Sequence, residues 1–470
     1  MLFNSFIFAA LLLVTFIIYY FPKFSKHQVF ILILSSLIFY AYEQPSLVLL
    51  LLFSAGLNVF TSYYIANGKP EWRKPLAVTG IVLNLCGLAF FKYSPLVSKV
   101  LFDPADSIGR FLISIPLPIG ISFFTFEGIS LLVDVFNQKY FDNKKIIPVS
   151  ISKHAQRTLF FISFFPHLVS GPILKAHDFF PQIESKKFGD IQWEKCFKIL
   201  VTGYFLKMVV ADNLKDFTFW IAYPYFESQS SLNLIIMLYG YSCQIFADFA
   251  GYSLIAIGLA KLFGYDFNDN FNFPYISTSF KEFWKRWHIS LSSFLMEYLY
   301  FPLGGNKHGK ARTYLNLMIT MVLGGLWHGA AWSYAVWGAF HGLALAIERF
   351  INDKFDIKFV RNTFTRFIKG CFIFSFITLA WLLFKLPEFN HVISYFRCMF
   401  NNFGTADNTS TIAYILIYSL PVILYHLHYL LRNKPFYTSL KRHEYLFYSI
   451  LLFLLITNSG SSGSFIYFQF

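Results

Sequence analysis

Two histidines in the stretch 271–349 have surroundings that could support acid–base chemistry. His288 stands in the basic, aromatic segment KEFWKRWHISLS, and His328 follows in the uncharged run GGLWHGAAW. An ionisable ring inside an apolar run is costly, so it is a candidate functional residue. Burial would disfavour the imidazolium, and a neutral, positioned imidazole is a competent general base near pH 7. The alternative for His328 is a structural hydrogen bond between helices.

Glycines surround His328 in the sequence. Gly324, Gly325 and Gly329 permit close backbone approach, so they could leave room for an extended substrate beside the ring. We therefore expect a passage at His328 that Trp327 lines.

The segment that carries His288 is also rich in cations. Lys285, Arg286 and Trp287 precede the histidine directly, as in an amphipathic helix lying at the cytoplasmic membrane interface. The two cations and the indole could bind the phosphates and body of an acyl donor. Simple anchoring to the membrane surface is the alternative.

Two further segments place polar residues inside apolar runs. Glu127 lies in the stretch 115–140, which prolines and glycines interrupt, and broken helices at membrane depth must be covered by protein or line a cavity. Gln244 and Asp248 are four residues apart and share a helical face. Glu127 could line a tunnel or join helices. Asp248 could orient a catalytic histidine or pack against a Tyr or Lys.

The C-terminus ends in an aromatic tail. Residues 458–464 read NSGSSGS, which is typical of a flexible linker, and FIYFQF follows. The phenol of Tyr467 could carry an acyl group as a reactive aryl ester and so act as a covalent relay. An aromatic anchor at the membrane interface is the alternative.

Composition places these residues in a membrane protein. The 470-residue chain is 56% hydrophobic and 14% charged, whereas a soluble domain carries about 25% charge. The net charge of +14 comes from clusters of Lys and Arg between apolar runs, as the positive-inside rule expects, so we do not predict nucleic-acid binding. The cluster pattern predicts that both termini lie outside the cytoplasm.

The apolar runs predict an all-α polytopic fold with roughly 11–12 transmembrane helices plus re-entrant pieces. A single membrane domain over 1–457 would contain the catalytic stretch 244–349, and 458–470 would form an extracytoplasmic tail. The run 158–173 is short and broken by prolines, which favours a re-entrant segment. The other runs lie at 2–20, 28–42, 46–66, 75–92, 197–211, 232–260, 370–386, 411–431 and 446–457.

The sequence contains no pattern typical of a metal site. The five cysteines form no CxxC pair, and His426 and His428 are two apart, so they point to different helical faces. We expect no metal and no resident cofactor.

Six motifs are spread over most of the chain. They are LPIGISFFTFEGISLLVDV (117–135), FFPHLVSGPI (164–173), QIFADFAGYSLIAIGLA (244–260), FNFPYISTSFKEFWKRWHISLS (271–292), YLYFPLGGNKHG (298–309) and LGGLWHGAAWSYAVWGAFHG (323–342). Together they resemble the membrane-bound O-acyltransferase family, within it the bacterial proteins that O-acetylate alginate, cellulose or peptidoglycan.

The resemblance implies a ring of helices around a funnel-shaped core with a central tunnel. It implies that the LWHG histidine, His328, is catalytic and that the WHIS histidine, His288, lies near the same tunnel. The ending FIYF is similar to an FxYF tail whose tyrosine is proposed to carry the acyl group, which here is Tyr467. An acyl donor would enter from the cytoplasm, and a periplasmic SGNH-hydrolase-like partner would place the acyl group on a polysaccharide.

The leading hypothesis is therefore an O-acetyltransferase of the bacterial inner membrane that uses acetyl-CoA. A composition rich in Phe, Ile, Lys and Asn suggests an AT-rich genome, which favours peptidoglycan as the acceptor over alginate. Alginate or cellulose acetylation and D-alanyl transfer to teichoic acid are the alternatives. A transporter or flippase of an acylated carrier, and a scaffold without chemistry, are hypotheses of other classes.

Overall fold

The computed structural model describes residues 1–103, 106–138, 147–355, 362–461 and 463, and these residues form helices, turns and loops with no strand. The chain divides into two compact units. The first comprises residues 1–199 and 255–268, and the second comprises 200–254 and 269–470. The prediction of a single membrane domain over 1–457 stays a prediction.

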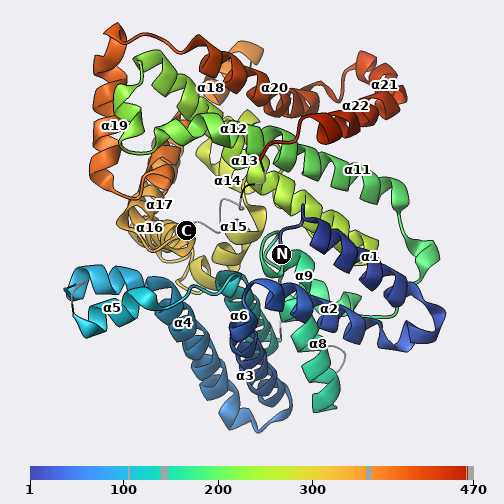
Figure 1. Ribbon diagram of the computed structural model, residues 1–470. Coiled ribbons are helices and arrows are strands. Elements are labelled where there is room, and N and C mark those ends of the chain that lie inside the picture. The colour runs from blue at the N-terminus through green and yellow to red at the C-terminus, as the bar shows by residue number, and fades with distance from the viewer. Residues whose placement is uncertain (104–105, 139–146, 356–361, 462, 464–470) are drawn as a thin grey trace. The chain divides into compact units, whose positions relative to one another are not determined.

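The first unit is built mainly from the N-terminal helices (Figure 1). Its described α-helices are α1 (Phe6–Tyr20), α2 (Gln28–Glu43), α3 (Val48–Asn67), α4 (Pro70–Leu101), α5 (Ser107–Ser114), α6 (Ile121–Asn137), α8 (Ile151–Ser163), α9 (Phe165–Leu168), α10 (Ala176–Phe179), the start of α11 (Trp193–Tyr204) and the end of α13 (Ser231–Leu262).

The second unit holds the C-terminal half. It contains the π-helix η5 (Phe205–Ala211), α12 (Asp212–Thr218), the first part of α13 (Ser231–Leu262), α14 (Phe280–Arg286), α15 (Ile289–Leu295), the π-helix η9 (Met296–Tyr300), α16 (Gly309–His328), α17 (Trp332–Lys354), α18 (Thr363–Lys385), α19 (Phe389–Asn401), α20 (Thr409–Leu431), α21 (Pro435–Arg442) and α22 (Glu444–Thr457).

Six helices in the described part of the chain are long and apolar enough to cross a membrane. They correspond to α2, α3, α4, α13, α18 and α20, and the shorter apolar helices α1 and α22 add to them. The remaining predicted runs form shorter or less apolar helices. The all-α polytopic fold is thus confirmed, while the number of eleven or twelve spans stays a prediction.

The predicted interruptions are confirmed before Ile121 and within 158–173, but not at Gly128, which lies inside the continuous helix α6. Helix α6 begins only at Ile121, after Gly120 adopts a left-handed backbone with φ of 78°. A Cβ on Gly120 would come 2.2 Å from the carbonyl oxygen of Leu168, so this turn requires glycine. The run 158–173 breaks between α8 and α9, and residues 160–176 are all buried.

Polar side chains join the helices of the first unit. Helices α3, α4 and α6 pack together (Figure 1), and Asn58 and Asn84 exchange two amide hydrogen bonds of 3.2 and 3.1 Å. A Cβ on Gly128 of α6 would lie 2.5 Å from the Asn58 amide nitrogen. A small residue at the crossing therefore lets three helices meet at one buried amide pair, a common device between membrane helices.

Glycines bring α16 and α17 together in the second unit, where the two helices lie side by side (Figure 1). A Cβ on Gly325 would come 2.1 Å from the Tyr334 carbonyl oxygen, and a Cβ on Gly329 would come 2.2 Å from the Tyr334 ring. We expected these two glycines to leave room for substrate. That expectation was wrong, because Tyr334 of α17 fills the space and the glycines serve helix packing.

Candidate active site

His328 is the last residue of α16, and its ring is buried with 4% exposure. The helix ends there because Gly329 takes an extended backbone, and α17 begins three residues later at Trp332. Aromatic rings from three successive helices enclose the imidazole. Their centroids lie 5.2 Å away for Trp327, 5.3 Å for Trp337 and 5.3 Å for Phe384.

His288 lies between α14 and α15 in a left-handed backbone conformation, with φ of 43° and ψ of 55°. A non-glycine residue pays about 1–3 kcal/mol for such a conformation, which persists only where the surroundings impose it. Here the neighbouring Ile289 N–H donates to the Asn270 carbonyl oxygen at 2.9 Å, which fixes the turn. The ring is fully buried.

A side-chain network defines which nitrogen of His288 carries the proton. The Ser290 N–H donates to the Asn270 Oδ1 atom at 3.2 Å, so this atom must be the amide oxygen. The same oxygen lies 3.1 Å from Nδ1 of His288, so Nδ1 donates and Nε2 is the acceptor nitrogen of the neutral ring. Asn270 in turn donates to Ser253 Oγ at 3.1 Å.

The structure brings the two predicted histidines together. Their ring centroids are 6.2 Å apart, although 40 residues separate them in the chain. Trp327 contacts both rings, and Phe249 of α13 covers His288 at 4.6 Å. The result is a pair of buried imidazoles in an aromatic enclosure, an arrangement suited to proton transfer from a substrate hydroxyl.

Comparison with known proteins identifies the family. The membrane-bound O-acyltransferase family model matches residues 153–386. The probable alginate O-acetylase AlgI of Pseudomonas aeruginosa is 34% identical over 417 residues, which cover 86% of this chain and 76% of that protein. This chain belongs to the membrane-bound O-acyltransferase family.

Other relatives are named for related acyl-transfer activities. The peptidoglycan O-acetyltransferase of Helicobacter pylori is 32% identical, over 78% of this chain and 73% of that protein. The teichoic acid D-alanyltransferase of Bacillus subtilis is 26% identical, over 78% of this chain and 92% of that protein. The protein is thus a multi-pass membrane acyltransferase, which favours the enzyme hypothesis over the transporter and the scaffold.

The predicted orienting residues lie beside each other on α13 of this acyltransferase. Asp248 Oδ1 is 2.7 Å from the Lys207 ammonium, which also lies 2.7 Å from Asp212 Oδ1. Gln244 accepts a hydrogen bond from Thr218. Asp248 therefore packs against a lysine, as one of the two predictions for it expected. Lys207, Asp248 and Asp212 form a buried group of one cation and two carboxylates. A role of Asp248 or Gln244 in orienting a histidine stays a prediction.

The predicted donor-binding residues differ in exposure. Lys285 is exposed, whereas Arg286 bonds to Glu282 through Nε at 3.1 Å and to the Asn272 carbonyl oxygen at 2.9 Å. Burial alone would raise the pKa of Glu282, but hydrogen bonds from Thr278 and the Arg286 charge lower that pKa overall. Trp287 is 1% exposed and stacks on Phe283, so it belongs to the core of the second unit.

Glu127 lies in the first unit beside a third buried histidine. Its Oε1 atom is 2.7 Å from Nδ1 of His167, and both side chains are fully buried. This contact joins α6 to α9, which fits the alternative that Glu127 serves to join helices. A place for Glu127 in a tunnel wall stays a prediction.

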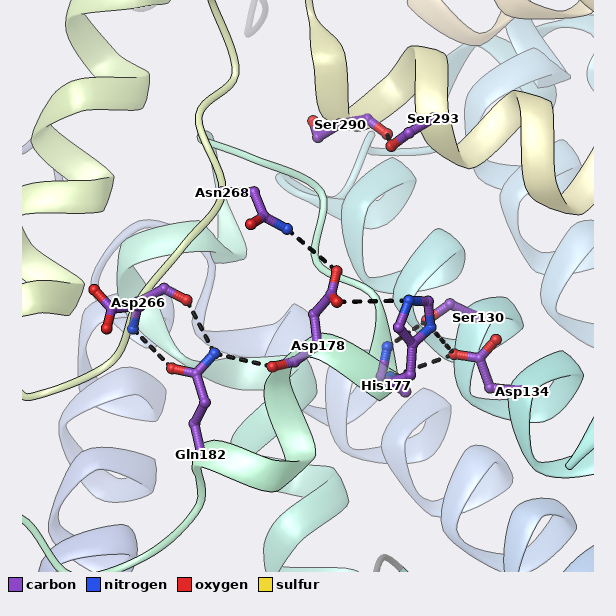
Figure 2. Close-up of polar contacts among 10 residues, drawn as sticks. Ser130, Asp134, His177, Asp178, Gln182, Asp266, Asn268, Ser290 and Ser293 are labelled. Atoms are coloured by element: carbon purple, nitrogen blue, oxygen red, sulfur yellow. Dashed lines mark hydrogen bonds and ion pairs between the residues drawn. The ribbon is translucent and has the colours of Figure 1, made fainter. Parts of the chain in front are cut away.

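A fourth histidine, which the sequence did not single out, forms a polar cluster in the first unit (Figure 2). His177 Nδ1 lies 2.9 Å from Asp134, and Nε2 lies 3.5 Å from Asp178. Asn268 donates to the other oxygen of Asp178 at 3.2 Å. Burial alone would lower the pKa of His177, but the hydrogen bond and charge of Asp134 and the charge of Asp178 raise that pKa overall.

The structure does not test two further predictions, the role of Tyr467 and the absence of a metal or cofactor. Tyr467 lies outside the described residues. Among the residues that the structure describes, no three His, Cys, Asp or Glu side chains gather as metal ligands would. The prediction that the enzyme needs no metal or cofactor stays a prediction.

Proposed function

We propose that this enzyme transfers an acetyl group from cytoplasmic acetyl-CoA to the extracytoplasmic side of the bacterial inner membrane for O-acetylation of a polysaccharide. The observation that carries the proposal is the buried pair of His288 and His328 within a chain of this family. Both termini would be periplasmic, as the distribution of cations between apolar runs predicts.

In the proposed reaction His328 is the general base. It removes the phenolic proton of Tyr467, and the phenolate oxygen attacks the thioester carbonyl carbon. The carbon–sulfur bond then breaks, and the thiolate of coenzyme A takes the proton from His328. The products are an acetyl ester on Tyr467 and a free thiol, so the base is regenerated in one cycle.

His288 would support this step from a fixed position. Its Nδ1–H bond to Asn270 fixes the tautomer, which leaves Nε2 as the acceptor nitrogen of the ring. An imidazole held in one tautomer can accept a hydrogen bond from the reacting group or from a water without reorienting. His288 is therefore assigned a supporting role, and His328 the proton transfer itself.

The exposed cation at α14 supports a donor site on the same segment. Lys285 would meet a phosphate of acetyl-CoA, while Arg286 and Trp287 would hold the segment in place. No cofactor is consumed beyond the donor. The charge of Arg286 is balanced in part by Glu282, so we assign Lys285 the larger share of the electrostatic attraction.

Peptidoglycan is the proposed final acceptor, reached through a periplasmic partner of the SGNH-hydrolase type. A serine of that partner would attack the tyrosyl ester, release the Tyr467 phenol and pass the acetyl group to a sugar hydroxyl. The H. pylori relative supports this acceptor, while the P. aeruginosa and B. subtilis relatives support alginate and teichoic acid as alternatives.

Substitution of His328 tests the proposal. We expect His328→Ala to abolish polysaccharide acetylation while the protein remains folded in membranes. His308→Ala is a matched control, because His308 is an exposed histidine of the same unit. Acetate released from purified wall polymer by mild base measures the product. Near-normal acetylation by the His328 variant would contradict the proposal.

A further inference from the structure

The described part of the C-terminal tail is held against the second unit. After α22 ends, the Asn458 carbonyl oxygen accepts a hydrogen bond from the Asn213 amide at 3.0 Å. The Asn458 side chain accepts a second from the Tyr418 hydroxyl at 3.2 Å. The first residue after the helix is therefore tied to both α12 and α20.

The next residues continue these contacts. The Gly460 N–H donates to the Met208 carbonyl oxygen at 2.9 Å, and Lys215 donates to both the carbonyl and the hydroxyl oxygen of Ser461 at 3.2 Å. Met208 belongs to the π-helix η5, a rare helix type that is frequent at functional sites. We predicted a flexible linker from residue 458, and this first part of it is hydrogen-bonded.

Gly460 fits its place only because it lacks a side chain. A Cβ there would lie 2.7 Å from the Asn213 nitrogen and 2.7 Å from the Asp212 carbonyl carbon. These are backbone atoms at the start of α12, so they cannot move aside as a flexible side chain could. Gly463 is buried, and a Cβ on it would come 3.3 Å from Asp212 Oδ1.

Asp212, which lies next to Gly460 and Gly463, belongs to a group of buried charges. Asp212 shares the Lys207 ammonium with Asp248 of α13, and the three side chains are 2–5% exposed. A buried group of this kind permits little rearrangement, because separating its members would leave an uncompensated charge. Gly460 and Gly463 thus lie against a rigid part of the second unit.

We propose that residues 458–461 and 463 form an anchor that positions the acyl-carrying tyrosine, with Gly460 as its positioning residue. This inference rests on the proposed function of Tyr467. Tyr467 is four positions after Gly463, which limits its reach from there to about 14 Å, whereas the nine positions from Asn458 would allow about 31 Å. The effective concentration of a tethered group falls roughly as the −3/2 power of tether length. Release of the anchor should therefore slow acyl transfer to Tyr467 about threefold or more.

The test uses the full-length enzyme in lipid nanodiscs with radiolabelled acetyl-CoA. Gly460→Val should release residues 458–461, seen as faster hydrogen exchange of their amides, and slow acetylation of Tyr467 about threefold or more. Ser459→Val is the matched control: it adds the same side chain one residue earlier, where Ser459 is exposed. We expect this control to keep wild-type exchange and rate.

A peptide acceptor separates the anchor from the catalytic centre. The peptide GSFIYFQF, added to the Tyr467→Phe enzyme, should be acetylated at the same rate with or without Gly460→Val. Equal slowing in both assays would place the effect at the catalytic centre and overturn the inference, as would faster exchange of residues 458–461 with an unchanged rate. If instead Tyr467 and the peptide are never acetylated by an enzyme that still acetylates the polymer, the relay itself fails.

Discussion

Buried imidazoles stand in different surroundings in the two units. In the first unit His167 lies 2.7 Å from the Glu127 carboxylate, and neither side chain reaches solvent. In the second unit aromatic rings enclose His328, and an amide network holds His288. A direct carboxylate partner suits a contact that holds two helices together, as Glu127 and His167 hold α6 and α9. An aromatic enclosure favours a neutral ring, which is what a base needs before it takes a proton.

The largest effect should come from breaking the joint of the first unit. Glu127→Ala leaves the His167 ring buried without its polar partner, and a buried polar group left without a hydrogen bond costs about 1–3 kcal/mol. We expect much less folded protein in membranes and a lower thermal midpoint in detergent. Glu127→Gln, which keeps hydrogen-bonding atoms in place, is the matched variant and should lose less.

The same measurements on His328→Ala complete this contrast. We expect that variant to unfold near the wild-type temperature while its activity is lost. Glu127→Ala could instead leave stability unchanged and abolish acyl transfer. Glu127 would then have a part in the reaction, and the distinction between a structural Glu127–His167 contact and a catalytic His328 would fail.

An intermediate effect is expected at Asn270, which fixes the tautomer of His288. Asn270→Ala should lower kcat about tenfold, the size of one lost positioning hydrogen bond of about 1.4 kcal/mol, with little change in KM for acetyl-CoA. Steady-state thiol release measured across pH checks this, because a mobile imidazole should also shift the pH profile.

Ser290→Ala is the control for Asn270→Ala. It removes a hydroxyl that donates to the same Asn270 oxygen at 2.9 Å but leaves the His288 contact in place. Equal losses of kcat in the two variants, with unshifted pH profiles, would indicate a general loss of packing instead of a role in positioning His288.

The sequence predicted the helices well and singled out His288 and His328 as candidates, because these features depend on local pattern. Apolar runs marked α3, α13 and α20 to within a few residues, and the break before α6 followed from its prolines and glycine. His328 stood out as an ionisable residue in an apolar run. By the same criterion Lys207, in the run YFLKMVVA, could have been found, and the buried charge group with it.

Other features depend on contacts that the sequence does not contain. Nothing in the segment DFNDNFNFP distinguishes Asn270 from its neighbouring asparagines, because its role arises from the turn at His288. The glycines near His328 were misinterpreted for a related reason: a glycine pattern indicates close approach but does not say what approaches. Here Tyr334 of the adjacent helix fills the space.

The smallest expected effect concerns His177, whose ring lies between Asp134 and Asp178 and is 13% exposed (Figure 2). These carboxylates raise its folded pKa above the ordinary value of 6.5 despite burial and the nearby charge of Lys175. A raised pKa means that the folded state holds the proton more tightly than the unfolded chain. The stabilisation is therefore complete below pH 6.5 and is lost as pH rises through the folded pKa.

Comparison of wild-type enzyme with His177→Gln isolates this contribution. The difference in thermal midpoint should be largest near pH 6 and shrink toward pH 8, while acyl transfer at a fixed pH stays unchanged. A difference that grows with pH would mean that the neutral ring is the stabilising form. His177 would then resemble the neutral imidazoles of the second unit and not the carboxylate-paired histidine of the first.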